Sequence, residues 1–257
     1  MIETKPSVYL IAHTTLTPEY EVWLKEIGGD TCLSHIDGQD SERLIELAAR
    51  RCYLSFAPSL NPNVKKVRTS SEDYHRNILS SGHGSVLEHA SATFAIEKVS
   101  RVFTHEIVRH RVGVAYSQES LRYVRLTELG FSIPDCIKQS DEAIELFRET
   151  VVYLEEQQYQ LAHMFDIDNM NEFSGKKILT SAFRRIAPMG LSTGIVVTAN
   201  FRALRWLIEH RTSPAAEAEM REVMGMVADI CMKEWPMVFG DFTRSANGTY
   251  APQYSKV

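Results

Sequence analysis

The chain has 257 residues, of which 44% are hydrophobic, and it carries a formal net charge of −5. That length is typical of one large domain or two small ones with a sizeable buried core. No apolar run approaches the roughly 18 residues that a membrane span needs, and Glu3 interrupts the start of the chain, so neither a membrane protein nor a secretory leader is expected. The four cysteines have no paired spacing, which argues against a disulfide framework or a zinc site. We expect a cytoplasmic protein with a single domain over residues 1–257.

Positive charge is concentrated in two places. Arginine outnumbers lysine 18 to 10, and ten arginines fall in two windows that contain no lysine. The first arginine window, residues 101–125, has a net charge of +3, and the second arginine window, residues 184–211, has +4, so the rest of the chain carries −12. An acidic body argues against nucleic-acid binding, which depends on many phosphate contacts. Forked guanidinium groups suit a few phosphates or carboxylates, with ordinary surface ion pairs as the alternative.

The hydropathy pattern predicts strands placed irregularly among long helices, which favours an α+β fold. In the first half of the chain we expect a strand over 7–14, a helix over 41–53 capped by Ser41, a helix over 72–80, a strand over 87–100 and a helix over 100–111. In the second half we expect an extended segment over 124–134, helices over 140–166 and 171–186, a strand over 191–200, and helices over 201–211 and 214–235. Residues 245–257 lack periodicity and are expected to be an arm or a disordered tail.

Several common catalytic patterns are missing. His83, His89, His105 and His110 lie within 28 residues, but His105 and His110 are about 140° apart around a helix and no HExxH pattern accompanies them. A metal site is therefore the weaker interpretation. No nucleophile elbow, dinucleotide-binding glycine motif or P-loop occurs, and Cys52 is expected to be a core residue. Any bound phosphate must be held by arginine side chains and helix termini.

The segment with the most polar chemistry is RHRVGVAYSQESLRY, residues 109–123, which predicts a helix end, a glycine loop and a polar turn over 117–120. It resembles the signature of the flavin-dependent thymidylate synthases, which is Arg-His-Arg, seven residues, Ser and then Arg-Tyr. Here eight residues separate Arg111 from Ser120. Further matches are GHGSVLEH at 82–89, AARRCY at 48–53, and the segment from Asn200-Phe201-Arg202 to Arg211, so that the likeness covers about residues 40–235.

The resemblance implies an α+β fold with an antiparallel or mixed sheet packed by helices, in a homotetramer with active sites shared between subunits. It also implies an enzyme in which FAD accepts hydride from NADPH and a methylene group passes from methylenetetrahydrofolate to C5 of dUMP, giving dTMP. Such enzymes use no cysteine nucleophile, which agrees with the absence of an activated cysteine pattern. In this interpretation the protein supplies position and charge.

The resemblance also assigns roles to individual residues. Ser120 would lie near the reacting base, and Arg211 would stabilise negative charge on the pyrimidine, so both are expected to be catalytic. His83, Ser85 and Glu88 fall where the family contacts FAD and folate. Cofactor binding is expected of His83, Ser85, Glu88, Arg109, His110, Arg111, Gln118, Asn200, Arg202 and Trp206. Substrate binding is expected of Glu106, Arg109, Gln118, Glu119, Ser120, Leu121, Arg122, Arg184 and Arg211.

Ordinary structural roles are open for several of these residues. Glu88 could form a surface ion pair, Arg109 could complement a helix dipole, and Asn200 could cap a helix. Arg185 is an alternative to its neighbour Arg184 as the nucleotide contact.

The sequence also departs from the family pattern. His105-Glu106 stands where Arg-Gln is usual, Trp206 replaces a polar residue, and Ala215 replaces a histidine. The extra residue in loop 112–119 predicts a longer, looser loop that could admit a 2′-hydroxyl, so UMP is an alternative substrate. A non-catalytic nucleotide-binding module and a histidine metal hydrolase are the alternatives from other classes.

Overall fold

The computed structural model describes residues 2–121 and 130–257, so the predictions for Arg122 and for most of segment 124–134 lie outside the described residues. The chain forms two compact units. The first unit contains the described residues of Met1–Val8, Ala95–His110 and Tyr116–Val196, and the second contains Tyr9–Phe94, Arg111–Ala115 and Val197–Val257. The single domain over residues 1–257 remains a prediction.

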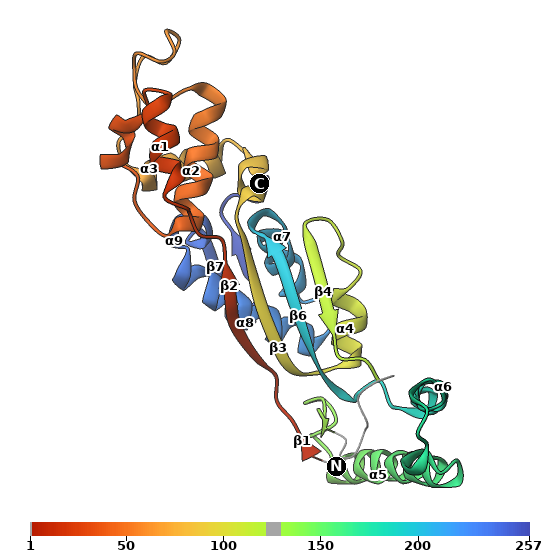
Figure 1. Cartoon of the computed structure of the whole chain (residues 1–257). Helices are drawn as coiled ribbons and strands as arrows, with labels where there is room; N and C mark the ends of the chain where they lie inside the picture. The colour runs from red at the N-terminus through yellow and green to blue at the C-terminus, as the bar shows by residue number, and fades with distance from the viewer. Residues whose placement is uncertain (1, 122–129) are drawn as a thin grey trace. The chain divides into compact units, whose positions relative to one another are not determined.

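A four-stranded sheet has the strand order β2-β3-β6-β4 (Figure 1). Its strands are β2 (Ser7–His13), β3 (Ser91–Ser100), β4 (Val114–Gln118) and β6 (Ser192–Asn200), and each contributes residues to both units. Ala92, Phe94 and Ile96 are buried at alternate positions of β3, as the period of two predicts. The strands predicted over 7–14 and 191–200 are confirmed. The strand predicted from residue 87 begins only at Ser91, because Gly84–His89 forms a 3-10 helix, η2.

In the first unit, helices pack around a small apolar core. Its elements are β1 (Ile2–Glu3), α4 (Arg101–Ile107), β5 (Gly130–Phe131), α5 (Asp141–Met164), η3 (Ile167–Asn169), α6 (Phe173–Phe183) and η4 (Arg184–Ile186). Strand β1 pairs in parallel with β5. The Ser140 hydroxyl accepts a hydrogen bond from Ala143 N at 3.3 Å and so caps α5, close to the predicted start of the helix. Val151 of α5 is buried in the core with Phe131 and Leu191.

The second unit is mainly helical. Its further elements are α1 (Glu19–Glu26), η1 (Asp30–Ser34), α2 (Asp40–Tyr53), α3 (Ser71–Ser80), α7 (Phe201–Arg211), α8 (Ala218–Glu234), α9 (Pro236–Phe239), β7 (Phe242–Arg244) and β8 (Tyr250–Pro252). The predicted core positions of α8 are all buried, namely Met220, Val223, Met224, Val227 and Cys231. Helices and sheet together confirm the α+β class.

Three predicted helix boundaries are wrong. Helix α2 begins after Gln39, whose N–H donates to the Glu42 carboxylate at 3.0 Å, while the Ser41 hydroxyl donates to Thr14 O at 2.9 Å. Helix α4 ends at Ile107, before the Arg-His-Arg segment. Helix α8 is capped by the Glu217 carboxylate rather than opened by Pro214, because that carboxylate accepts from two N–H groups of the first turn.

The last residues form ordered structure instead of a loose tail. Strands β7 and β8 pair antiparallel, and Tyr250 is buried. Tyr250 N donates to the Thr212 hydroxyl at 2.9 Å, which ties the hairpin to the end of α7. Among the described residues, no helix combines the length and apolar character that a membrane crossing requires.

Candidate functional site

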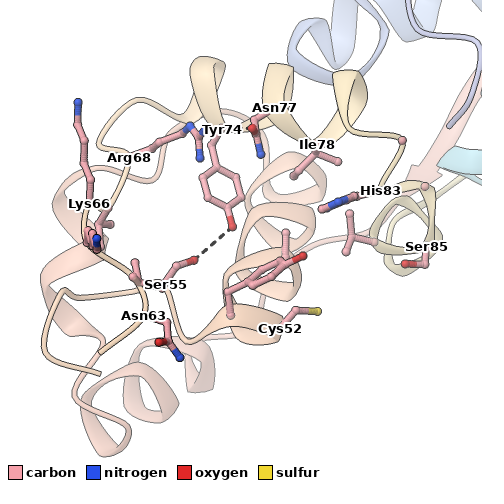
Figure 2. Close-up of a pocket in the computed structure, with 18 of the residues that line it drawn as sticks. Cys52, Ser55, Asn63, Lys66, Arg68, Tyr74, Asn77, Ile78, His83 and Ser85 are labelled. Carbon is pink, nitrogen blue, oxygen red and sulfur yellow. Dashed lines mark hydrogen bonds between the residues drawn. The ribbon is translucent and has the colours of Figure 1, made fainter. Parts of the chain in front are cut away.

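The second unit contains a pocket of about 760 Å³ (Figure 2). That volume is within the usual range of small-molecule and cofactor sites, roughly 300–1,000 Å³. Its walls come from α2, from loop 54–70, from α3, from the turn before η2 and from Arg202 of α7. Two segments far apart in the sequence therefore bring His83, Ser85 and Arg202, all expected from the resemblance, to one pocket.

The pocket lining is positively charged. Lys65, Lys66, Arg68 and Arg202 line it, and none of the described lining residues is an aspartate or glutamate. Sequence analysis missed the first three of these residues because they lie outside both arginine windows. The sequence feature that could have indicated these three residues is the run Lys65-Lys66-Val67-Arg68, which follows a segment rich in proline and asparagine. A pocket with several cations and no carboxylate suits an anionic ligand.

Aromatic and polar groups complete the pocket wall. The Tyr53 and His83 rings are stacked, with centroids 6.3 Å apart and planes 19° apart. The Ser55 and Tyr74 hydroxyls lie 3.4 Å apart, as the dashed line in Figure 2 marks. A planar ring system could stack on such a wall while its polar edges meet hydroxyl groups.

Arg202 and Glu88 form an ion pair beside the pocket. Arg202 Nη1 donates to Glu88 Oε1 at 2.6 Å, and both side chains are about half exposed. A Cβ at Gly84 would lie 2.9 Å from Arg202 Nε, so the glycine allows the guanidinium to approach the backbone of η2. The surface pair considered for Glu88 is thus present, and it holds Arg202 at the pocket.

Asn200 caps α7, as its alternative role predicts. Its side-chain oxygen accepts from Ala203 N at 2.8 Å, and its backbone N–H donates to Gly113 O at 2.9 Å. Gly113 has a φ of +70°, and a Cβ there would lie 2.5 Å from Asn200 Nδ2. Glycine is therefore required where the chain enters β4. The expected contact of Asn200 with a cofactor remains a prediction.

In the first unit, β4 holds α4 and the Arg-His-Arg segment. The Tyr116 hydroxyl lies 2.7 Å from Ile107 O and 2.8 Å from His110 O, and Gln118 Nε2 donates to the Thr104 hydroxyl at 2.9 Å. Residues 114–118 are thus a paired strand, which corrects the predicted polar turn and the predicted looser loop.

Two residues predicted to bind substrate have structural roles. Glu119 pairs with β6: its backbone N–H donates to Gly194 O at 3.1 Å, and its carboxylate accepts from Gly194 N at 3.1 Å. Leu121 is buried in the apolar core of the first unit. Their expected substrate contacts remain predictions, but strand pairing and packing explain both residues.

Arg101 is a further candidate for anion binding, which the family resemblance does not include. Its Nη1 atom is buried and has no hydrogen-bond partner among the described residues. Burial, together with the positive charge of Arg184, lowers the pKa of the Arg101 guanidinium. The positive charges of Arg101 and Arg184 thus influence each other, and Arg101 has a buried nitrogen without a described partner. An anion bound here would neutralise the charge and accept a hydrogen bond from that nitrogen. The sequence signal was only the lack of acidic neighbours.

The remaining predicted residues lie outside the described lining of the pocket. Glu106, His110 and Ser120 are half-buried in the first unit, where Arg109 and Arg184 are exposed. In the second unit Arg111 is exposed and Arg211 is half-buried, while Trp206 stacks on His210 with ring centroids 4.2 Å apart. The predicted site residues are thus distributed over both units, and their binding and catalytic roles remain predictions.

The cysteines divide between core and surface. Cys52 lines the pocket and is exposed, which corrects its predicted place in the core. Cys231 is buried, and burial raises the pKa of its thiol. The described part of the chain contains no group of three or more His, Cys, Asp or Glu side chains arranged to hold a metal ion.

Comparisons with known proteins give the family. The family model described as thymidylate synthase complementing protein matches residues 33–237. The flavin-dependent thymidylate synthase of Corynebacterium glutamicum is 34% identical over 251 residues, which are 93% of this chain and 91% of the relative. That of Corynebacterium diphtheriae is 38% identical over 210 residues, covering 80% and 81% of the two chains. The chain therefore belongs to the flavin-dependent thymidylate synthase family.

A solved structure confirms the fold. The UMP/dUMP methylase PolB from Streptomyces cacaoi, bound with 5-Br dUMP, superposes with a TM-score of 0.65. The match covers 93% of this chain and 96% of the methylase, at 16% sequence identity. At that identity the likeness concerns the fold.

Proposed function

We propose that this protein catalyses the reductive methylation of dUMP at C5, giving dTMP, with FAD as its flavin. The observation that carries the proposal is the meeting of His83, Ser85 and Arg202 around one pocket with no described acidic lining residue. These residues come from segments that match the family signature, and the family model spans them. The curated relatives in this family are named flavin-dependent thymidylate synthases.

The pocket fits a flavin dinucleotide. Arg202 offers a half-exposed guanidinium for a phosphate, and the stacked Tyr53 and His83 offer a flat surface for a ring. Bound FAD would supply the hydride chemistry. Glu88 would keep Arg202 oriented, and Ser85 would donate or accept a hydrogen bond at the ligand. Arg109, His110 and Arg111 are proposed to complete the cofactor contacts.

The first unit supports a nucleotide phosphate site. Arg101 and Arg184 are proposed to hold the phosphate of dUMP, because Arg101 has a buried nitrogen without a described partner. Gln118, held by Thr104, is proposed to orient the base. Ser120 would lie beside the reacting base, and Arg211 would stabilise negative charge that develops on the pyrimidine.

Further parts of the proposal come from the family resemblance. NADPH would be the reductant and methylenetetrahydrofolate the carbon donor, in a cytoplasmic enzyme whose partners are small molecules rather than nucleic acid or membrane. A homotetramer with shared active sites is proposed. It is supported by exposed apolar side chains on α5 and α6, since such surfaces mark protein contacts; they include Leu146, Tyr153, Met164, Phe173 and Ile178.

The test is a flavin spectrum combined with product analysis. We expect flavin absorbance near ~450 nm and dTMP formation that requires dUMP, NADPH and methylenetetrahydrofolate. Arg202→Ala should lose bound FAD, whereas Arg76→Ala, which removes an exposed helix ion pair, should retain it. A preparation that binds no added FAD overturns the proposal. UMP turnover as fast as dUMP turnover would assign the alternative substrate.

The proposed chemistry uses no enzyme thiol. Cys52 is exposed at the pocket, and its Sγ donates weakly to Ala48 O at 3.5 Å. Cys52→Ala is therefore expected to form dTMP. Loss of turnover in a normally folded Cys52→Ala variant would instead indicate a thiol mechanism.

A further inference from the structure

The cations at the pocket rim are arranged as a row. Lys65, Lys66 and Arg68 follow one another on loop 61–70, which contains no helix or strand at these positions. No ion pair of Lys65 or Lys66 occurs within the described residues. Figure 2 shows Lys66 and Arg68 on one side of the pocket and His83 and Ser85 on the other. A ligand that reaches across the pocket would therefore meet His83 at one end and the row of cations at the other.

The loop is fixed at its base by a buried arginine. Arg50 Nη1 donates to Ser55 O at 2.9 Å, and Arg50 Nη2 donates to Arg68 O at 2.8 Å. The same guanidinium pairs with Glu46, and both side chains are fully buried. The Arg50 side chain thus joins the two ends of loop 54–70, which includes Lys65, Lys66 and Arg68. Charged hydrogen bonds of this kind are strong, so Arg50 holds the row of cations at the pocket rim.

Hydrogen bonds inside the loop fix its course further. Asn61 Nδ2 donates to Tyr53 O at 2.7 Å, Asn63 N donates to Asn61 Oδ1 at 2.9 Å, and Val64 N donates to Asn61 O at 2.9 Å. Arg68 Nη2 donates to Asn77 Oδ1 at 2.9 Å, which orients that guanidinium against α3. The lysine amines are flexible point charges on a defined backbone.

We infer that Lys65, Lys66 and Arg68 bind the carboxylate tail of the folate co-substrate, with preference for a tail of several glutamates. This inference rests on the proposed function, and it adds a binding site outside both arginine windows. A row of point charges matches carboxylates that follow one another along a flexible chain. One compact phosphate would instead suit a converging cluster or an arginine fork. The described lining has no carboxylate that would repel such a tail.

The test compares tail lengths in the flavin-loaded enzyme. The KM for methylenetetrahydrofolate is measured with one glutamate and with five, for the wild type and for the double variant Lys65→Ser/Lys66→Ser. The wild type should show a KM about fivefold to tenfold lower for the pentaglutamate, as expected of two or three exposed charge contacts. The double variant should lose this gain, so that its KM values for the two tails agree within about twofold.

A matched control removes the same charge elsewhere. Lys25→Ser/Lys233→Ser removes two exposed lysines of the second unit and should keep the preference for the long tail. Equal KM values for both tails in an active wild type overturn the inference alone. A wild type that forms no dTMP overturns the proposed function and the inference with it. The double variant could instead raise the KM for NADPH but not for NADH, and keep the preference for the long tail. Because NADPH has one more phosphate than NADH, that result would overturn the inference and show that the loop binds a phosphate.

Discussion

The two arginine windows have nearly the same charge in the sequence, but Arg101 of the first window and Arg205 of the second have opposite environments in the structure. In the second arginine window, Arg205 is buried, and both terminal nitrogens of its guanidinium are hydrogen-bonded. It forms two hydrogen bonds with the Asp241 carboxylate, donates to Val238 O and to Tyr254 O, and lies 4.8 Å from the centre of the Phe242 ring. In the first arginine window, Arg101 has a buried nitrogen with no described partner.

This difference separates structural arginines from binding arginines. A buried guanidinium whose terminal nitrogens are both hydrogen-bonded within the protein stabilises the fold, because little of it is left for a ligand. A buried guanidinium with an unused donor costs stability unless a ligand completes it. The sequence therefore shows where positive charge is concentrated. The hydrogen bonds of each guanidinium in the structure then indicate whether that arginine stabilises the fold or binds a ligand.

The largest effect is expected at Arg205. Arg205→Ala leaves Asp241 buried without its partner, since the two side chains are only 3% and 7% exposed. The free energy of unfolding should fall by about 3 to 5 kcal/mol. Denaturant unfolding followed by circular dichroism measures this change.

A neighbouring arginine on α7 is the matched control. Arg202 pairs with Glu88, but the side chains are 46% and 47% exposed, so Arg202→Ala should lower stability by less than about 1 kcal/mol. Equal losses in the two variants would show that burial does not divide the arginines in this way.

The next effect is expected at Arg101. Arg101→Gln should raise the Kd for dUMP by about 30-fold to 100-fold, because it removes a charged donor from the proposed phosphate site. The same change should leave stability unchanged or raise it, since it removes a charge with an unpaired buried nitrogen. Calorimetric titration with dUMP and denaturant unfolding give the two quantities.

Arg185 provides the comparison for this variant. Arg185 is exposed next to Arg184, and Arg185→Gln should leave the Kd for dUMP within about twofold of wild type. An Arg101→Gln variant that loses stability and keeps its affinity for dUMP would place Arg101 with the structural arginines.

Local patterns predicted most of the fold. Strand β6 and helices α7 and α8 follow their apolar periods, because each buries a continuous face. Helix α5 was also predicted, although Val151 is its one buried residue. Strand β4 was not predicted, since it lies at the edge of the sheet and carries polar residues such as Ser117 and Gln118. The hairpin of β7 and β8 was missed because Tyr250 is its main buried anchor in a polar stretch.

The candidate site could be predicted from the sequence only at residues that belong to a family motif. His83, Ser85 and Arg202 belong to segments that match the family, and the structure places all three at one pocket. Lys65, Lys66 and Arg101 follow no motif, and their role depends on which acidic side chains lie near them in space. Sequence distance does not give that information, because the pocket joins α2, α3 and α7.

The smallest predicted effect concerns Tyr250, which is hydrogen-bonded to Thr212 just after the last residue of the second arginine window. Burial, the hydrogen bond from its hydroxyl to Asp229 and the charge of Asp229 raise the pKa of Tyr250 to about 12. The protonated form is thus favoured in the folded protein. Its stabilising effect is complete below the ordinary tyrosine pKa of about 10 and is lost as the pH rises through the folded pKa.

Between about pH 9 and pH 11, the free energy of unfolding of the wild type should therefore fall by about 1 to 2 kcal/mol more than that of Tyr250→Phe. Tyr9→Phe, at an exposed tyrosine, should follow the wild type instead. Denaturant unfolding at several pH values measures the three proteins side by side. Parallel curves for wild type and Tyr250→Phe would mean that Tyr250 ionises as freely in the folded chain as in the unfolded one. The hairpin would then be less tightly bound to α7 than its hydrogen bonds to Thr212 and Asp229 indicate, and the contrast between the two arginine windows would rest on Arg205 alone.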